Sequence, residues 1–284
     1  MWLALLGMHL VGLVGFNLLL RKSHKNKVDG YALATILQVG IAIPAVFLLV
    51  IFPPDILAFS ATVWLFLAVA IVFTIGLHIS NVTALKYLEA GVYAIVYNLR
   101  IVFTTVLGII FLNEEFILLR IIGGGLILLA IFIIKQRSSK SARLHGLLWG
   151  LAAAMTLSVL NITEKTLINN IGFINYFPLL AVVSAILMLG FYFHKNKKIE
   201  ASVFLGPNMI KLMIFRALSA YGFSGALGAG ALVSVGNYVS GMSVIFTVLL
   251  GAWLLGETDY LGRKIAAAGL AFAGLTLVLL ASLV

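Results

Sequence analysis

The sequence predicts an all-α integral membrane protein with ten transmembrane helices, arranged as two inverted five-helix repeats. Hydrophobic residues make up 63% of the 284 residues and charged residues only 10%, and the mean hydropathy is +1.17. This composition is too apolar for a protein that covers its surface with water-facing side chains. The apolar residues form long runs, each near the roughly 20 residues that a helix needs to cross the hydrocarbon core. The chain also repeats itself at half its length.

Ten apolar runs are expected to span the membrane. Turn residues mark some of the boundaries, such as Asp29–Gly30 and Pro53–Pro54 on either side of the second run. The stretch from Leu212 to Gly256 has no charged loop, but its 45 residues are too many for one crossing at a rise of about 1.5 Å per residue, so we divide it into two spans. The expected spans cover approximately residues 2–20, 31–52, 61–81, 90–112, 117–135, 145–163, 173–193, 209–228, 231–255 and 263–283.

An internal repeat organises these spans. When the chain is shifted by 143 residues, Ala90–Gly125 aligns with Val233–Ala268, and identical residues coincide at several positions. The coincident pairs include Phe103 and Phe246, Thr104 and Thr247, Gly108 and Gly251, Glu114 and Glu257, and Arg120 and Arg263. We therefore expect a first repeat over residues 1–135, a basic linker over 136–144 and a second repeat over 145–284. Five spans per repeat is an odd number, so the second repeat must enter the membrane inverted.

The distribution of lysine and arginine predicts the orientation. Fifteen of these residues lie in or beside the odd-numbered loops, and only Arg120 and Lys165 belong to the even-numbered ones. Basic loops stay in the cytoplasm, so the sequence places both termini on the non-cytoplasmic side of a cell (inner or plasma) membrane. The basic residues sit in short clusters between apolar runs, and a nucleic-acid partner is therefore not expected.

Several of these segments resemble the EamA-type, ten-helix members of the drug/metabolite transporter superfamily. The resemblance covers both halves and rests on Ala84–Tyr87, on Leu112–Glu114 and its counterpart Leu255–Glu257, and on the small residues of Gly123–Gly125 and Ala266–Gly269. It implies a carrier of small organic solutes with a central cavity lined by the first, third and fourth helices of each half, and no cofactor. The family often has a proline midway along the fourth helix, where this chain has Ile101 and Val244.

Arg100 is the sharpest candidate for substrate binding. It lies 11 residues after Glu89, about 16 Å along a helix, and an arginine at that depth costs at least about 2.5 kcal/mol unless it faces a cavity or a partner. It could bind a carboxylate or phosphate, or be a structural arginine satisfied by backbone carbonyls. Tyr93 and Tyr97 share its helical face, and Asn98 lies beside it.

Further polar residues of the expected spans are candidates for lining the cavity, although each could equally serve helix packing. The equivalent helix of the second half offers neutral groups only, with Ser243 at the position of Arg100. His9 lies mid-span and is either a titrating site residue or a satisfied core histidine. Arg216 is explained as well by snorkelling to the basic side as by binding. The additional candidates are Asn17, Asn161, Asn237 and Tyr238.

Glu114 and Glu257 recur at the same repeat position. We expect them to pair with Arg120 and Arg263, fixing the turn between the fourth and fifth helices of each half. A role in proton coupling is the alternative.

Three functions are weighed. The first is a secondary transporter of amino-acid-like zwitterions or organic anions that works by alternating access. The second is proton-coupled efflux of lipophilic cations, which needs a buried acid that none of the expected spans contains. The third is a membrane-embedded enzyme acting on a lipid phosphate, for which the scattered acids offer no catalytic cluster. We favour the first, a non-enzymatic carrier without metal, with a small-molecule substrate and the lipid bilayer as partners, as a monomer or a homodimer.

Overall fold

The computed structural model of the chain is all-helical over the residues that it describes, which are all except 26–28, 113–117, 134–139, 196–205, 232 and 281–284. Helices occupy each of the ten predicted regions. They are α1 (Trp2–Lys25), α2 (Gly30–Ile51), α3 (Ala61–Tyr87), α4 (Ala90–Tyr97), α5 (Leu99–Leu112), α6 (Leu118–Ile133), α7 (Lys140–Ile171), α8 (Phe173–Lys195), α10 (Pro207–Gly228), α11 (Val233–Leu255) and α12 (Leu261–Leu280), with a short 3-10 turn, η1, at Ile56–Ala58.

Local sequence explains several of the helix starts. The Asp29 side chain accepts a hydrogen bond from the Ala32 amide at 3.0 Å and begins α2, and Ser60 caps α3 in the same way through the Val63 amide. Both are N-caps that satisfy an otherwise unpaired donor of the first turn. Pro207 begins α10, at a position where its missing amide hydrogen costs nothing.

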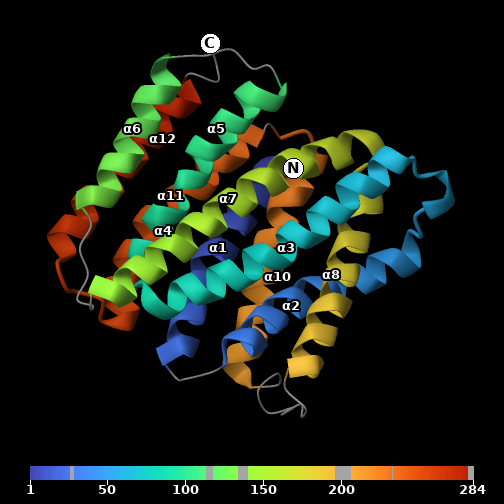
Figure 1. Cartoon of the computed structure of the whole chain (residues 1–284), viewed down its shortest axis with the longest axis horizontal. Helices are drawn as coiled ribbons and strands as arrows, with labels where there is room; N and C mark the ends of the chain where they lie inside the picture. The colour runs from blue at the N-terminus through green and yellow to red at the C-terminus, as the bar shows by residue number, and fades with distance from the viewer. Residues whose placement is uncertain (26–28, 113–117, 134–139, 196–205, 232, 281–284) are drawn as a thin grey trace.

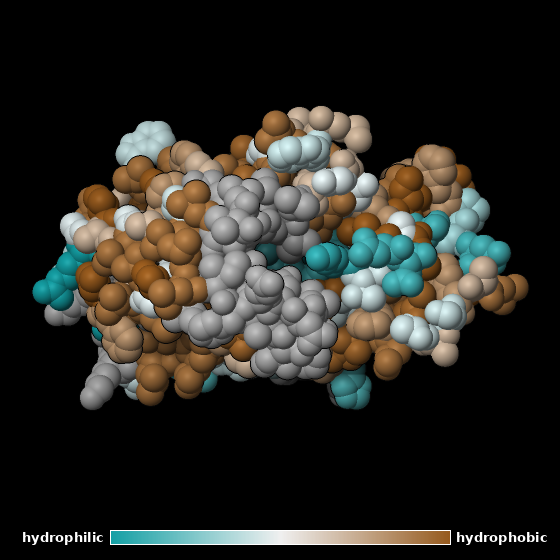
Figure 2. All heavy atoms as spheres, turned by 90° about the horizontal axis from the view of Figure 1, so that it is seen from above, coloured by the Kyte–Doolittle hydropathy of each residue, from teal (hydrophilic) through white to brown (hydrophobic). Residues whose placement is uncertain are grey.

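In the described chain, five helices are long enough and apolar enough to cross a membrane. The apolar segments Ala90–Thr104 and Val239–Leu255 are shorter than these five. The five are Trp2–Ser23, Gly30–Ile51, Ala61–Tyr87, Ser141–Ile171 and Phe173–His194. Large apolar side chains such as Phe47, Phe132 and Trp253 are exposed, and brown apolar atoms cover much of the face drawn in Figure 2. This surface suits a lipid environment, and the protein is a multi-pass membrane protein.

The helices pack across the two halves of the chain. The most extensive contacts join α3 to α7, α1 to α10, α6 to α12 and α2 to α8. Figure 1 shows α6 and α12 together at one edge of the bundle, and α2 and α8 toward the other. The α1–α10 contact depends on glycine, because a Cβ atom built at Gly12 would lie 2.4 Å from the backbone nitrogen of Ser219. Small residues at such crossings let membrane helices approach closely.

Several predicted boundaries differ from the structure, and two of the differences affect the cavity. The fourth region is not one helix from 90 to 112, because α4 ends at Tyr97 and α5 begins at Leu99. The sixth region does not end near residue 163, because α7 continues to Ile171. The extra turns of α7 tolerate polar residues, since the hydroxyls of Thr163 and Thr166 donate to carbonyls four residues earlier and thereby satisfy themselves within the helix.

Candidate substrate-binding cavity

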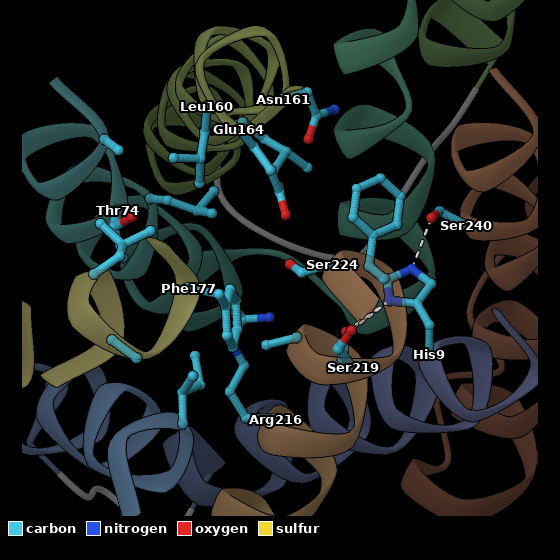
Figure 3. Close-up of a pocket in the computed structure, with 18 of the residues that line it drawn as sticks. His9, Thr74, Leu160, Asn161, Glu164, Phe177, Arg216, Ser219, Ser224 and Ser240 are labelled. Atoms are coloured by element: carbon cyan, nitrogen blue, oxygen red, sulfur yellow. Dashed lines mark hydrogen bonds between the residues drawn. The ribbon is translucent and has the colours of Figure 1, made fainter. Parts of the chain in front are cut away.

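A cavity of about 100 Å³ lies in the middle of the bundle, between α1, α2, α3, α7, α8, α10 and α11 and beside the break between α4 and α5. Its wall combines aliphatic and aromatic side chains with a similar number of polar side chains that converge on the cavity (Figure 3). Polar groups that converge in a buried pocket are typical of a small-molecule site. The polar lining residues are His9, Gln38, Thr74, Tyr97, Arg100, Asn161, Glu164, Tyr176, Arg216, Ser219, Ser224, Asn237 and Ser240.

The break at Asn98 positions Arg100 at the start of α5. The Asn98 amide donates to the Ile95 carbonyl at 3.2 Å, closing a tighter turn than the α-helix, and the side-chain nitrogen of Asn98 has no partner in the described chain. The Ser158 hydroxyl of α7 donates to the Arg100 carbonyl at 2.8 Å. This bond holds the first turn of α5 against α7 and fixes the direction in which the Arg100 side chain leaves the backbone.

The Arg100 guanidinium is buried and only partly satisfied. The residue is 3% exposed, its guanidinium carbon lies 5.0 Å from the centre of the Tyr97 ring, and it hydrogen-bonds to the Tyr97 side chain. Its Nε and Nη2 atoms have no hydrogen-bond partner among the described residues. Unsatisfied charged donors are costly in a buried site, so they favour an anionic group as their partner.

Arg216 of α10 is a second arginine of the cavity, and its sequence position is compatible with both snorkelling and binding. Its side chain rises from α10 toward the cavity in Figure 3 and passes 5.4 Å from the centre of the Phe16 ring. Its Nε atom is buried without a partner in the described chain. The side chain therefore points to the cavity and does not snorkel to a membrane surface.

Glu164 corrects the expectation that no span contains a buried acid. It lies within the candidate membrane-spanning helix α7, is 6% exposed and lines the cavity. The Tyr176 hydroxyl donates to its Oε1 atom, and Ser224 forms a further side-chain hydrogen bond. The prediction failed because the apolar run ends at Ile162, whereas the helix and its burial continue.

His9 connects three helices at the edge of the cavity. Its Nδ1 atom lies 2.7 Å from the Ser219 carbonyl oxygen of α10, and its Nε2 atom lies 2.7 Å from the Ser240 hydroxyl of α11. A carbonyl can only accept, so Nδ1 carries a proton and donates to Ser219. His9 thus lines the cavity and is hydrogen-bonded by its neighbours, as expected of a satisfied core histidine.

The structure brings some predicted site residues to the cavity and places others behind its wall. Tyr97, Arg100, Asn161, Asn237 and His9 line it. Asn161 donates to the side-chain oxygen of Asn237 at 3.3 Å. The side chain of Tyr238 lies outside the described residues.

The predicted residues behind the wall are buried but are not lining residues. Tyr93 stacks on Tyr97 with ring centroids 5.3 Å apart and donates its hydroxyl to Asn81, so it supports the ring that faces Arg100. The other predicted residues in this position are Asn17, Asn98 and Ser243.

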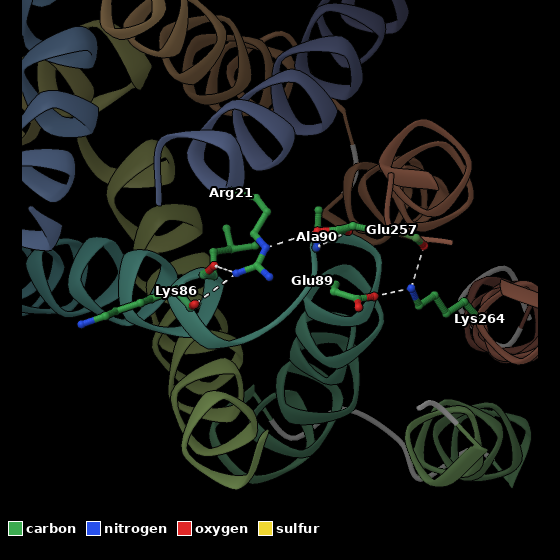
Figure 4. A network of polar contacts seen from close by, with 7 residues as sticks. Arg21, Lys86, Glu89, Ala90, Glu257 and Lys264 are labelled. Atoms are coloured by element: carbon green, nitrogen blue, oxygen red, sulfur yellow. Dashed lines mark hydrogen bonds and ion pairs between the residues drawn. The ribbon is translucent and has the colours of Figure 1, made fainter. Parts of the chain in front are cut away.

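A second polar cluster lies at one end of the bundle (Figure 4). Arg21, at the end of α1, pairs with Glu257 at 3.2 Å and donates to the carbonyls of Leu85 and Lys86. The second carboxylate oxygen of Glu257 accepts from the Ala90 amide at 3.0 Å. We call Arg21, Glu89, Glu257 and Lys264 the end network.

Lys264 completes the end network. It pairs with the Glu89 carboxylate and donates to the Glu257 carbonyl at 2.7 Å. Burial raises the pKa of the Glu89 carboxyl, and its bond to Lys264 acts in the opposite direction. The network connects the loop before α4 with the loop between α11 and α12.

The predicted pairing of Glu257 with Arg263 is wrong. Glu257 points inward to Arg21 on α1, whereas Arg263 is exposed. The alignment of the two repeats shows that the spacing from glutamate to arginine is the same in both halves, but it does not reveal the contact of Glu257 with Arg21 on a distant helix. The equivalent predicted pair is Glu114 with Arg120, and Glu114 and the Arg120 side chain lie outside the described residues.

The comparisons identify the class of protein. A solved structure described as "Crystal structure of protein" has a TM-score of 0.65 to this chain at 14% identity, over 95% of this chain and 96% of that chain, a likeness that shows the fold alone. No curated protein matches the chain. Residues 1–136 match the family described as the "EamA-like transporter family", which is part of the drug/metabolite transporter superfamily. This match confirms, over the first half of the chain, the resemblance seen in the sequence.

Proposed function

We propose that this protein is a secondary transporter of small solutes that carry a carboxylate, either amino-acid-like zwitterions or organic anions. The observation that supports this function is the pair of cavity arginines, Arg100 and Arg216, whose Nε atoms and Arg100 Nη2 are buried without partners in the described chain. Charge-assisted hydrogen bonds to a carboxylate are about twice as strong as neutral ones. A carboxylate would supply acceptors for these donors.

The helix contacts support an arrangement of ten spans as two inverted repeats. When the chain is aligned with itself after a shift of half its length, α1 corresponds to α7, α2 to α8, α3 to α10 and α6 to α12. The contact of α3 with α7 then maps onto that of α10 with α1, while the α2–α8 and α6–α12 contacts map onto themselves. A pseudo-twofold axis between the halves would produce this exchange, and rocking of inverted repeats about a central site is a common basis of alternating access.

The position of the end network supports a bundle whose cavity is closed toward one side of the membrane. Arg21 lies 12 residues after His9 on α1, about 18 Å farther along the helix. On α11, the helix end that precedes Glu257 is 15 residues beyond Ser240, about 22 Å. The network therefore lies well beyond the cavity on both helices. The excess of lysine and arginine on this side supports a cytoplasmic location for it, with both termini on the opposite side of a cell membrane.

A second candidate function is efflux of lipophilic cations coupled to protons, and Glu164 is the observation that favours it. A buried acid could exchange a proton for a cation. The cavity, however, also contains two arginines, which repel a cation that has no anionic group. The charge of the cavity therefore favours the carboxylate-bearing solutes.

Counterflow in proteoliposomes tests the proposed function. Purified protein is reconstituted with each of a panel of unlabelled amino acids, organic acids and quaternary amines inside, and uptake of the labelled compound is followed. We expect counterflow of amino acids or organic acids and none of the quaternary amines. Counterflow of quaternary amines alone would reject the proposal in favour of cation efflux.

A further inference from the structure

The acid of the cavity is bound by neutral groups only. Glu164 enters from α7, on the side of the cavity away from Arg216, and its carboxylate is directed toward Ser224 (Figure 3). Its hydrogen bonds come from Tyr176 and Ser224. Among the described residues, Glu164 takes part in no ion pair. Its negative charge is therefore not neutralised by direct contact with a cationic side chain.

Two amide oxygens of the same cavity are also free to accept hydrogen bonds. Gln38 donates its amide nitrogen to the Ala181 carbonyl at 3.0 Å, and Asn161 donates to Asn237. Those bonds assign the nitrogens and leave Gln38 Oε1 and Asn161 Oδ1 buried without partners among the described residues. Asn161 lies three residues before Glu164, which places both side chains on one face of α7.

A primary ammonium group matches this set of acceptors. It has three N–H donors and a positive charge, and it accepts nothing. Glu164 supplies the opposite charge, and the two amide oxygens supply neutral acceptors. A plain organic anion would leave the two amide oxygens without a donor and the Glu164 carboxylate without an opposite charge, and a site built to bind an N–H group discriminates strongly against analogues that lack it.

We propose that Glu164, with Gln38 and Asn161, forms an ammonium subsite, so that the transporter prefers zwitterionic amino acids to organic anions. This inference rests on the proposed function and narrows it to one substrate class. The carboxylate end of the solute is bound by Arg100 and Arg216, and the ammonium end by the Glu164 side. Glu164 is then a specificity-determining residue.

Three matched probes separate the two ends of the solute. Leucine carries both charges and suits the aliphatic lining from Leu13, Leu157 and Leu160. 4-Methylpentanoate is leucine without its amino group, and 3-methylbutylamine is leucine without its carboxylate. Alanine with propionate, and phenylalanine with 3-phenylpropionate, extend the comparison to smaller and larger side chains. Kd values come from thermal stabilisation of the detergent-purified protein as a function of ligand concentration.

In the wild-type protein we expect leucine to bind at least about tenfold more tightly than 4-methylpentanoate, as the loss of a charge-assisted hydrogen bond implies. In Glu164→Gln this preference should disappear, because leucine binding weakens to the level of 4-methylpentanoate, whose own Kd changes little. Retained binding of 4-methylpentanoate also shows that the variant is folded. Asp259→Asn, which removes an exposed acid outside the cavity, is the matched control.

The alternatives have different outcomes. If Glu164→Gln keeps the preference for amino acids, the ammonium subsite is wrong while the proposed function stands. If the wild-type protein binds the carboxylates but none of the three amino acids, the inference also fails and an organic-anion carrier remains. If Glu164→Gln weakens leucine and 4-methylpentanoate equally, Glu164 is a counter-charge that positions the arginines, and the subsite is rejected. If the wild-type protein binds only 3-methylbutylamine, the proposed function itself fails.

Discussion

Replacing Glu257 by glutamine should open the end of the bundle that the end network closes. The substitution removes the charge that pairs with Arg21 at 3.2 Å, while the glutamine oxygen can still accept from the Ala90 amide. Lys264 keeps its bonds to the Glu257 backbone carbonyl and to Glu89. The change therefore isolates one ion pair of the network.

The magnitude follows from the surroundings of that pair. Hydrogen bonds to charged groups contribute about 1.5–3 kcal/mol. The Arg21 side chain is 17% exposed and keeps its bonds to the carbonyls of Leu85 and Lys86, so we take the lower part of this range, about 1.5–2 kcal/mol. Because about 1.4 kcal/mol is a factor of ten, the population open at this end should rise about 10- to 30-fold.

Cysteine labelling measures this population directly, since the chain has no native cysteine. A single cysteine is placed at Thr74, which lines the cavity, and its rate of reaction with a membrane-impermeant maleimide is measured in vesicles that expose the network side. We expect Glu257→Gln to raise the rate about 10- to 30-fold, and Asp259→Asn, an exposed acid of the same loop, to leave it unchanged. An unchanged rate in Glu257→Gln, with only a lower melting temperature, would refute the idea that the network gates the cavity.

Two further predictions concern packing and topology. Gly12→Leu should separate α1 from α10, because even a Cβ atom there would lie 2.4 Å from the Ser219 nitrogen; overpacking of this kind costs about 1–3 kcal/mol or more. The melting temperature should therefore fall clearly below that of Gly7→Leu, a control on the same helix where a Cβ atom meets nothing within 4 Å; equal stabilities would contradict the packing argument. In intact cells, a cysteine at Leu57, which is 94% exposed in the turn before α3, should react with an impermeant maleimide, and one at Tyr260 only after permeabilisation. The reverse pattern would invert the proposed orientation.

The sequence predicted the helical regions because apolar run length is a strong signal in membrane proteins. The break at Asn98 was not predicted, since no proline or glycine interrupts the run there. It depends on local hydrogen bonds of the turn and on the contact between Ser158 and the Arg100 carbonyl, and the partners of such a tertiary contact cannot be read from one segment.

The cavity was only partly predictable for a similar reason. Arg100 stood out because charge is rare within an apolar run. Glu164 lies where apolar character ends along the chain but where the folded bundle still buries it, and Arg216 lies close enough to a basic segment for snorkelling to explain it. The buried face of α7 continues past Ile162, and α8 and α10 supply neutral hydrogen-bond donors beside it. Both features become visible only when the helices are assembled.

The central claim is that the guanidinium groups of the cavity bind the carboxylate of the transported solute, and counterflow by Arg100→Gln tests it most directly. Wild-type protein, Arg100→Gln and Arg263→Gln are reconstituted in equal amounts, with Arg263 as an exposed arginine far from the cavity wall. We expect kcat/KM for the best amino acid or organic acid to fall about 10- to 100-fold in Arg100→Gln and to stay at the wild-type value in Arg263→Gln. Wild-type counterflow by folded Arg100→Gln would contradict the account.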